Sequence, residues 1–249
     1  MRIEDQPAFI LHGRAWRETS LLIEAFTRDH GRVGLVARGV RGAKSRFARA
    51  SLQPLQPLLI GWSARGELGT LTSAEQTGSP WRLSGDALFA GMYVNELVLR
   101  LSSRNDPHPV AFGAYAECLG RLAESDDIAW TLRRFERDLL ADLGYALMLT
   151  HAADGMPIEP GVSYAYIGDT GPVAWREDSG LVRIAGSALL ALDRDERPGA
   201  TDLADLRKLM RSVIRDLVGG QLNAWALSSR RIVDAVDATR KPEAPADFV

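Results

Sequence analysis

The pattern of apolar residues changes near residue 80, and this change constrains the fold more than any other feature of the sequence. Before it, short apolar runs alternate with turn-forming segments such as residues 27–31 and 64–67, which is typical of β-strands. After it, apolar residues recur at helical spacing over longer segments. We therefore predict an α+β protein, with a β domain over residues 1–80 and a mainly helical domain over residues 81–237.

The β domain is expected to be a small barrel. Strands are predicted around Ala8 and Ile10 and over residues 20–26, 32–37, 55–62 and 68–75. Five short strands in a domain of this size favour a closed or nearly closed barrel. An OB-fold barrel is the leading interpretation, because this fold is a common platform for nucleic acids. An SH3-like barrel would produce much the same strand pattern and stays open.

The second domain is predicted from its helices and from the segments that interrupt them. The helical segments are residues 83–101, 110–123, 128–143, 187–192, 203–218 and 229–236. Glycines and prolines break the helical pattern over residues 150–185, which predicts a small insert of loops and short β-strands, the latter at residues 163–167 and 181–184. Residues 238–249 are polar and rich in proline, so this tail is expected to be disordered.

A basic stretch, residues 34–49 with the sequence GLVARGVRGAKSRFAR, is the first candidate binding site. It contains no acidic residue, and its basic side chains are Arg38, Arg41, Lys44, Arg46 and Arg49. Residues 1–80 contain 11 Lys/Arg and 7 Asp/Glu, whereas residues 81–249 contain 19 and 25. We predict that these five side chains bind a nucleic-acid backbone, because the positive charge is concentrated in the barrel half. The alternative is a solvated basic turn.

Three arginines in the segment LRRFERDLLADLGY, residues 132–145, form the second candidate site. Arg134 and Arg137 are three residues apart and share one side of the predicted helix, with Arg133 beside them. They could hold an acidic peptide with an apolar end at the lip of an apolar groove. The alternative is pairing within the helix, for example between Arg133 and Glu136.

Two tryptophans of the barrel half, Trp16 and Trp62, could stack on nucleic-acid bases. A role in the core or at the barrel rim is the alternative for each of them.

No pattern of catalytic or metal-binding residues stands out in the sequence. The four histidines are far from one another and from Cys118, the single cysteine, so we predict no metal, no cofactor and no catalytic residue. The single cysteine and the absence of a long apolar run predict a cytoplasmic protein without a membrane partner. A metal-dependent nuclease and an RNA-binding OB-fold protein remain alternative functions.

The order of several segments resembles the bacterial DNA repair and recombination mediator family RecO. These segments are VARGVRGAKSRF (36–47), GTLTSAE (69–75), YVNELVLRL (93–101), LRRFERDLLADLGY (132–145) and DLVGGQLNAWALSSR (216–230). The similarity covers nearly the whole chain in the right order. It implies an N-terminal OB barrel, a helical C-terminal domain and a non-enzymatic activity.

The resemblance also implies partners. Members of the family bind single-stranded and double-stranded DNA, anneal complementary strands, and act with RecR to load RecA onto DNA coated by single-strand binding protein. Their C-terminal domain receives the acidic, phenylalanine-ended tail of that protein, and an arginine of the RRFE segment belongs to the site. Either Arg133 or Arg134 could be that arginine. Some members carry a four-cysteine zinc module after the Leu-Gly-Tyr, but residues 150–185 contain no cysteine, so zinc is not expected.

Overall fold

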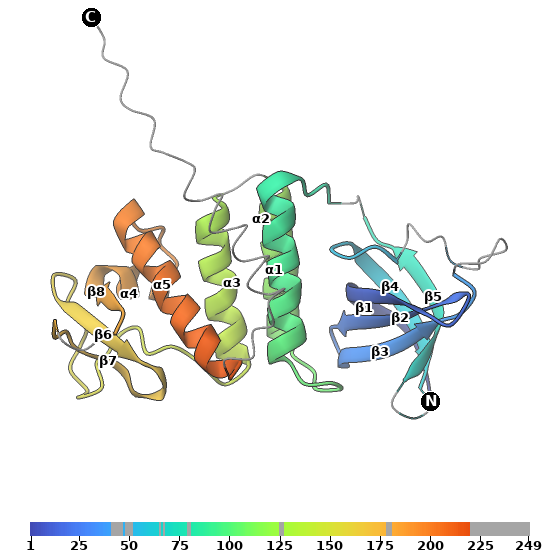
Figure 1. The fold of residues 1–249 in the computed structure, drawn as a ribbon, viewed down its shortest axis with the longest axis horizontal. Coiled ribbons are helices and arrows are strands. Elements are labelled where there is room, and N and C mark those ends of the chain that lie inside the picture. The colour runs from blue at the N-terminus through green and yellow to red at the C-terminus, as the bar shows by residue number, and fades with distance from the viewer. Residues whose placement is uncertain are drawn as a thin grey trace, which may run out of the picture.

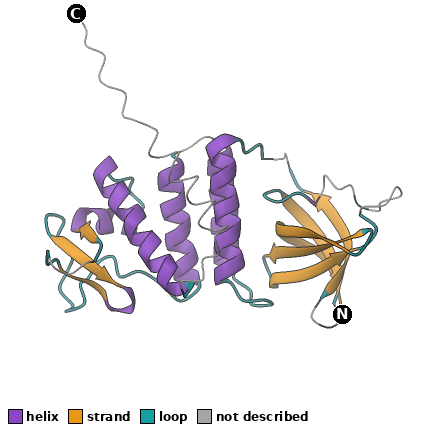
Figure 2. Cartoon of the chain, viewed as in Figure 1, coloured by secondary structure: helices purple, strands orange, loops and turns teal. Residues whose placement is uncertain are grey.

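The computed structural model describes residues 1–40, 47, 52–64, 66, 68–78, 81–124, 127–177 and 181–219. A five-stranded barrel lies at one end of the molecule and a small three-stranded sheet at the other, with helices between them (Figure 1). Figure 2 shows the same separation of strands and helices by colour. The predicted α+β class is therefore confirmed. The predicted helix at 229–236 and tail at 238–249 lie outside the described residues.

The barrel is closed, and its connectivity identifies its type. Its strands are β1 (Arg2–Trp16), β2 (Ser20–Thr27), β3 (Gly31–Ala37), β4 (Pro57–Ser63) and β5 (Gly69–Gln76). The order around the barrel is β1-β2-β3-β5-β4, and antiparallel pairing of β1 with β4 closes it. The pairing of β3 with β5 is parallel and all other pairs are antiparallel. This Greek-key order supports the OB-like interpretation over the SH3-like alternative.

The helical layer follows directly on the barrel. Its helices are α1 (Gly85–Leu101), α2 (Pro109–Ala123), α3 (Ile128–Asp142), α4 (Gly186–Asp193) and α5 (Ala200–Leu217). Pro109 at the first turn suits the start of α2, and the Asp127 carboxylate caps α3 by accepting a 3.1 Å hydrogen bond from the Trp130 N–H. None of the described helices has the length and apolar content needed to cross a bilayer.

The insert predicted over residues 150–185 contains three short strands. Two of them overlap the predicted strands, and the third was not predicted. The strands are β6 (Ser163–Ile167), β7 (Gly171–Ala174) and β8 (Arg183–Ala185), in the order β7-β6-β8. The missed strand β7 contains Gly171 and Pro172, which locally favour a turn, and it is held by pairing with β6. Tyr164 and Ile184 anchor the sheet to the helices because both are buried in the same core.

Two hydrophobic cores stabilise the chain, and the second one crosses the boundary near residue 80. The first fills the barrel and includes Ile10, Ile23, Leu35 and Ile60. The second is built by the helices, but it also contains Phe9, Leu11 and Phe26 from the outer surface of the barrel. The barrel is therefore packed against the helices through a shared apolar interface.

Aromatic rings form the centre of that interface. Phe9 lies 5.3 Å from Phe112 and 4.8 Å from Tyr115, measured between ring centroids. Phe26 lies 5.4 Å from Phe112, and Trp81 stacks on Phe9 at 5.8 Å. Tilted and stacked rings at these spacings add to the free energy gained by burial.

Polar groups fix the orientation of the barrel on the helices. The Arg32 guanidinium donates to the Glu24 carboxylate (3.0 Å) and to the Ser102 carbonyl oxygen (3.1 Å), and Arg104 pairs with the other side of Glu24. The Asn95 amide donates to the Leu11 carbonyl oxygen at 3.0 Å. Because these hydrogen bonds join β-strands to α1 and to the loop after it, only one docking orientation satisfies them.

Candidate nucleic-acid interface

The basic side chains of the basic stretch, residues 34–49, begin where β3 ends. Arg38 is exposed directly after the last strand residue, and Gly39 follows with a left-handed φ of +71° that suits glycine. Val40 and Phe47 are buried in the barrel core, so the stretch is anchored to the barrel at both positions. Of the predicted DNA contacts, the structure thus places Arg38. The others, Arg41, Lys44, Arg46 and Arg49, lie outside the described residues.

The hairpin of β1 and β2 presents a second exposed segment. A β-bulge between Ile10 and His12 shifts the register of the two strands. Beyond the bulge, residues 12–15 of β1 are exposed, whereas residues 8–11 before it are buried. Trp16 is partly exposed, and the Arg14 guanidinium lies 6.0 Å from the centre of its ring. Trp62 is only 3% exposed, so it belongs to the barrel core rather than to a stacking surface.

The structure separates the three arginines predicted as a peptide site. The Arg133 side chain is 4% exposed and makes two hydrogen bonds to Glu136, at 2.7 and 2.6 Å. The Glu136 carboxylate is fully buried and also accepts a 2.6 Å hydrogen bond from the Tyr93 hydroxyl. Pairing within the helix, the alternative considered from sequence, is thus present for Arg133. Its burial does not favour it as a contact for a partner.

Arg134 and Arg137 reach the surface, where both contact Asp195. Arg134 makes two hydrogen bonds to the Asp195 carboxylate at 2.6 and 2.5 Å, and Arg137 makes one at 3.2 Å. Arg137 also donates to the Leu192 carbonyl oxygen at 2.6 Å. Burial alone would raise the pKa of Asp195, but the two guanidinium groups outweigh it and lower that pKa. The pair therefore already holds one carboxylate, supplied by the turn after α4.

A small hollow lies beside Arg134, between α2 and α3. Its volume is about 10 Å³, and it is lined by Glu117, Cys118, Arg121 and Phe135 among others. A phenylalanine ring does not fit such a hollow unless the neighbouring side chains move. Burial is the main cause of the raised pKa of the Cys118 thiol, and the nearby Glu136 and Glu117 carboxylates raise it further. This thiol is therefore no activated nucleophile.

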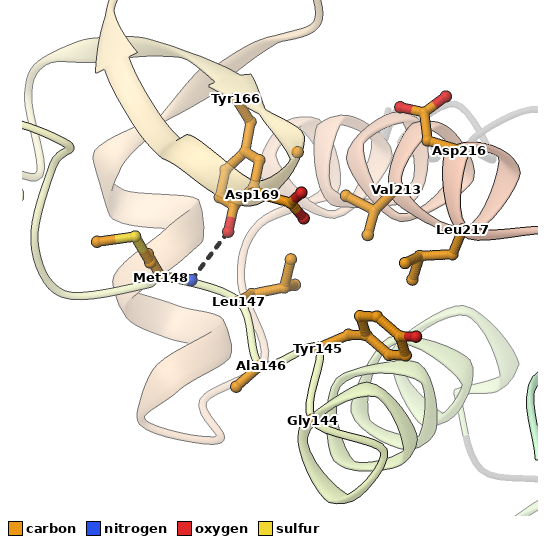
Figure 3. A pocket seen from close by; sticks show the side chains of 11 residues that line it. Gly144, Tyr145, Ala146, Leu147, Met148, Tyr166, Asp169, Val213, Asp216 and Leu217 are labelled. Atoms are coloured by element: carbon orange, nitrogen blue, oxygen red, sulfur yellow. Dashed lines mark hydrogen bonds between the residues drawn. The ribbon is translucent and has the colours of Figure 1, made fainter.

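A larger pocket of about 380 Å³ lies where the small sheet meets the helices (Figure 3). It is lined by the segment after α3, the end of β6 and the end of α5, and Tyr145 and Leu217 face it from two sides. The Tyr166 hydroxyl accepts a 2.8 Å hydrogen bond from the Met148 N–H. The charged lining residues are Asp169 and Asp216, both acidic, so the pocket does not suit a phosphate group.

The acidic, histidine and cysteine side chains do not assemble a metal site within the described part of the chain, where no group of three or more of them could hold an ion. Asp195 and Asp127 form ion pairs with Arg134 and Arg197. Sequence reasoning overlooked Arg14 and Asp195 as functional candidates. The Arg-x-Trp spacing in an exposed strand could have indicated Arg14, but no local signal connects Asp195 to α3.

Comparison with known proteins gives a consistent result. Residues 1–80 match the family described as recombination protein O N terminal, and residues 82–226 match recombination protein O C terminal. The chain is 48% identical over 231 residues to a DNA repair protein RecO of Stenotrophomonas maltophilia, covering 91% of this chain and 97% of that protein. It is 45% identical over 232 residues to DNA repair protein RecO of Xanthomonas oryzae pv. oryzae, with the same coverage.

Proposed function

Because this chain belongs to the RecO family of DNA repair proteins, we propose that it acts as a recombination mediator. In this proposal it binds single-stranded and double-stranded DNA and anneals complementary strands. With RecR it helps to load RecA onto DNA coated by single-strand binding protein. In this proposal the protein is not an enzyme, and it acts in the cytoplasm. Membership of the family shows a role in DNA repair, and we propose DNA binding, strand annealing and help in RecA loading as the activities behind that role.

The observation that carries the proposal is the basic end of the OB-like barrel. Arg38 is exposed at the end of β3 and opens a stretch with five basic side chains and no acidic one. Val40 and Phe47 are buried in the barrel core, so these two positions of the stretch are held to the barrel. Contacts to phosphates alone would hold two strands together, reduce their repulsion and leave the base edges free to pair.

The first prediction concerns these five side chains. Replacing Arg38, Arg41, Lys44, Arg46 and Arg49 together by alanine should weaken binding of a single-stranded oligonucleotide on the order of 100-fold at low salt. Each phosphate contact contributes about 0.7 to the slope of log K against log salt, so the slope should fall by up to about 3.5. Fluorescence anisotropy titrations at several salt concentrations measure both quantities.

A matched control removes exposed basic side chains elsewhere. Arg28 lies in the turn between β2 and β3, and Lys208 lies on α5. Their side chains are 52% and 62% exposed. The Arg28→Ala/Lys208→Ala variant should keep the salt slope of the unchanged protein. If the fivefold variant also keeps that slope, the basic stretch is not the DNA contact.

We place the partner peptide, the acidic tail of single-strand binding protein, at Arg134 and Arg137. Asp195 supports this placement because its carboxylate already occupies the two guanidinium groups as a peptide carboxylate would. The peptide must then displace Asp195, and a movement of the α2–α3 surface must make room for its phenylalanine. Arg133 has a structural role on the buried side of α3, where it forms an ion pair with Glu136.

The second prediction uses this competition. Arg134→Ala should weaken binding of an acidic, phenylalanine-ended peptide roughly tenfold, because a charge-assisted hydrogen-bond pair is lost. Asp195→Asn should strengthen the same binding by roughly two- to fivefold, because the internal competitor loses its charge. Isothermal titration calorimetry measures both, and DNA affinity should stay unchanged in each variant. Equal peptide affinities in all three proteins would rule out this surface.

A further inference from the structure

We propose that Trp16, flanked by Arg14 and Arg38, forms a base-stacking subsite for single-stranded DNA on the outer face of β1, β2 and β3. The inference rests on the DNA binding proposed above and adds to it a stacking contact with the faces of unpaired bases. A subsite of this kind distinguishes single strands from duplexes, because the base faces of a duplex are already stacked.

The strand register places these side chains on one surface. Ile23 and Ala25 of β2 point into the barrel core, so the alternate residues Leu22, Glu24 and Phe26 point outward. Phe26 is covered by Phe112 of α2, and Glu24 is covered by Arg104 of the loop after α1. Leu22, further along the same face, is 9% exposed but does not belong to the core that the helices share with the barrel, so this remaining part of the face lies beyond the shared interface.

Trp16 and Arg14 lie on this remaining part. Trp16 pairs with Ser20, and Arg14 pairs with Leu22, so both side chains share the outward face of β2. Leu21 pairs with Ala37, and Arg38 directly follows Ala37, so the backbone of Arg38 lies at the same end of the strands as Ser20. Trp16, Arg14 and Arg38 thus lie at the same end of three adjacent strands.

Exposure and charge favour a nucleic-acid strand as the occupant. Trp16 is partly exposed, whereas Trp62 and Trp130 are 3% and 8% exposed. Arg14 is exposed, and its guanidinium is 6.0 Å from the Trp16 ring centre, close enough to support the ring from one side. Within the described residues, neither Arg14 nor Arg38 forms an ion pair with a carboxylate, although Glu18 lies in the hairpin turn.

These properties match the chemistry of a single strand. The ring offers a flat apolar surface for a base, and the two arginines offer positive charge for the adjoining phosphates. Stacking on a ring uses the face of the base and leaves its pairing edge free. The subsite is therefore compatible with annealing, because a held strand can still meet its complement.

The chain contains a matched control for the test. Trp175 is also partly exposed, and the Arg183 guanidinium lies 5.9 Å from its ring centre. Trp175 directly follows β7 and Arg183 lies in β8, so this pair is beside the small sheet at the other end of the molecule. A general effect of removing an exposed Arg–Trp pair should therefore appear equally at both places. An effect of the proposed subsite should appear only at Trp16.

The experiment compares Trp16→Leu, Trp16→Phe and Trp175→Leu with the unchanged protein, after circular dichroism shows that each is folded. Each protein is titrated with a fluorescent oligo-dT and with an oligomer of equal length that carries central abasic sites. The unchanged protein should bind oligo-dT about tenfold more tightly than the abasic strand. Trp16→Leu should lose this preference but keep the salt slope and duplex affinity, whereas Trp16→Phe and Trp175→Leu should keep the preference.

Two outcomes would overturn the inference. One is an unchanged preference for oligo-dT in Trp16→Leu, and the other is an equal loss in Trp175→Leu. If Trp16→Leu does not fold, Trp16→Phe provides the second measurement, because oligo-dT should then quench less tryptophan fluorescence than in the unchanged protein. Equal quenching would count against the subsite. Failure of the unchanged protein to bind any DNA would instead refute the proposed function.

Discussion

Replacing Glu136 by alanine is expected to destabilise the protein by about 3–5 kcal/mol. The carboxylate is fully buried and accepts hydrogen bonds from Arg133 at 2.7 and 2.6 Å and from the Tyr93 hydroxyl at 2.6 Å. Its removal takes the Glu136 carboxylate away from the Arg133 cation, whose side chain is 4% exposed. A buried charge that loses its counterion costs far more free energy than the pair contributed. Urea unfolding followed by circular dichroism measures the change.

A double variant separates this effect from simple loss of packing. Arg133→Met together with Glu136→Leu removes both charges and keeps most of the side-chain volume, so it should be much less destabilised than Glu136→Ala. The Tyr93 hydroxyl then loses one acceptor, which limits the recovery. If the double variant is as unstable as Glu136→Ala, the buried charge is not the cause.

Replacing Gly31 by alanine is expected to destabilise the protein by more than about 2 kcal/mol. Gly31 has a φ of +64°, and an added Cβ atom would lie 2.0 Å from the carbonyl oxygen of Asp106. No side-chain rotation relieves a contact with backbone, so the loop between α1 and α2 must move. That movement would break the 2.9 Å hydrogen bond from the Asn105 N–H to the Arg32 carbonyl oxygen, and with it part of the barrel–helix interface.

Gly39 provides the control for the backbone conformation alone. Its φ is +71°, and an added Cβ atom would meet no other heavy atom within 4 Å. Gly39→Ala should therefore cost only about 1–2 kcal/mol, the strain of a left-handed alanine. Thermal or urea unfolding of both variants gives the comparison. Equal destabilisation would mean that the contact with Asp106 relaxes without loss and does not restrain the interface.

The two halves of the fold could be predicted because their signals are local. The helices begin and end close to the predicted positions, since Pro109 and Asp127 at helix starts and Gly144 after a helix end act on their own neighbours in the chain. Strand β7 was missed because Gly171 and Pro172 favour a turn locally, and the strand exists only through its pairing with β6. The sequence also did not show which part of the outer barrel face is buried. The alternation of residues along β2 is the same whether Phe26 contacts water or Phe112.

The candidate sites also depend partly on the local sequence and partly on tertiary packing. The charge of the basic stretch is a property of the sequence, because no fold can place an acidic residue of the same segment beside Arg38 when none is present. The spacing of Arg133 and Glu136 indicated an ion pair within the helix, but the tertiary structure decided that the pair is buried. Tertiary packing also brought Asp195 to Arg134, across 61 residues of chain.

The change of apolar pattern near residue 80, and the positive charge of the half before it, were thus determined by the sequence alone. Both are properties of residues close together in the sequence, so they do not depend on how the strands and helices are arranged in space. Only the tertiary structure decided that the helices cover one part of the outer barrel face and leave Trp16, Arg14 and Arg38 uncovered. The reason is physical: burial depends on contacts between residues distant in sequence, such as Phe9 with Tyr115, and no local pattern encodes which distant surface a side chain will meet.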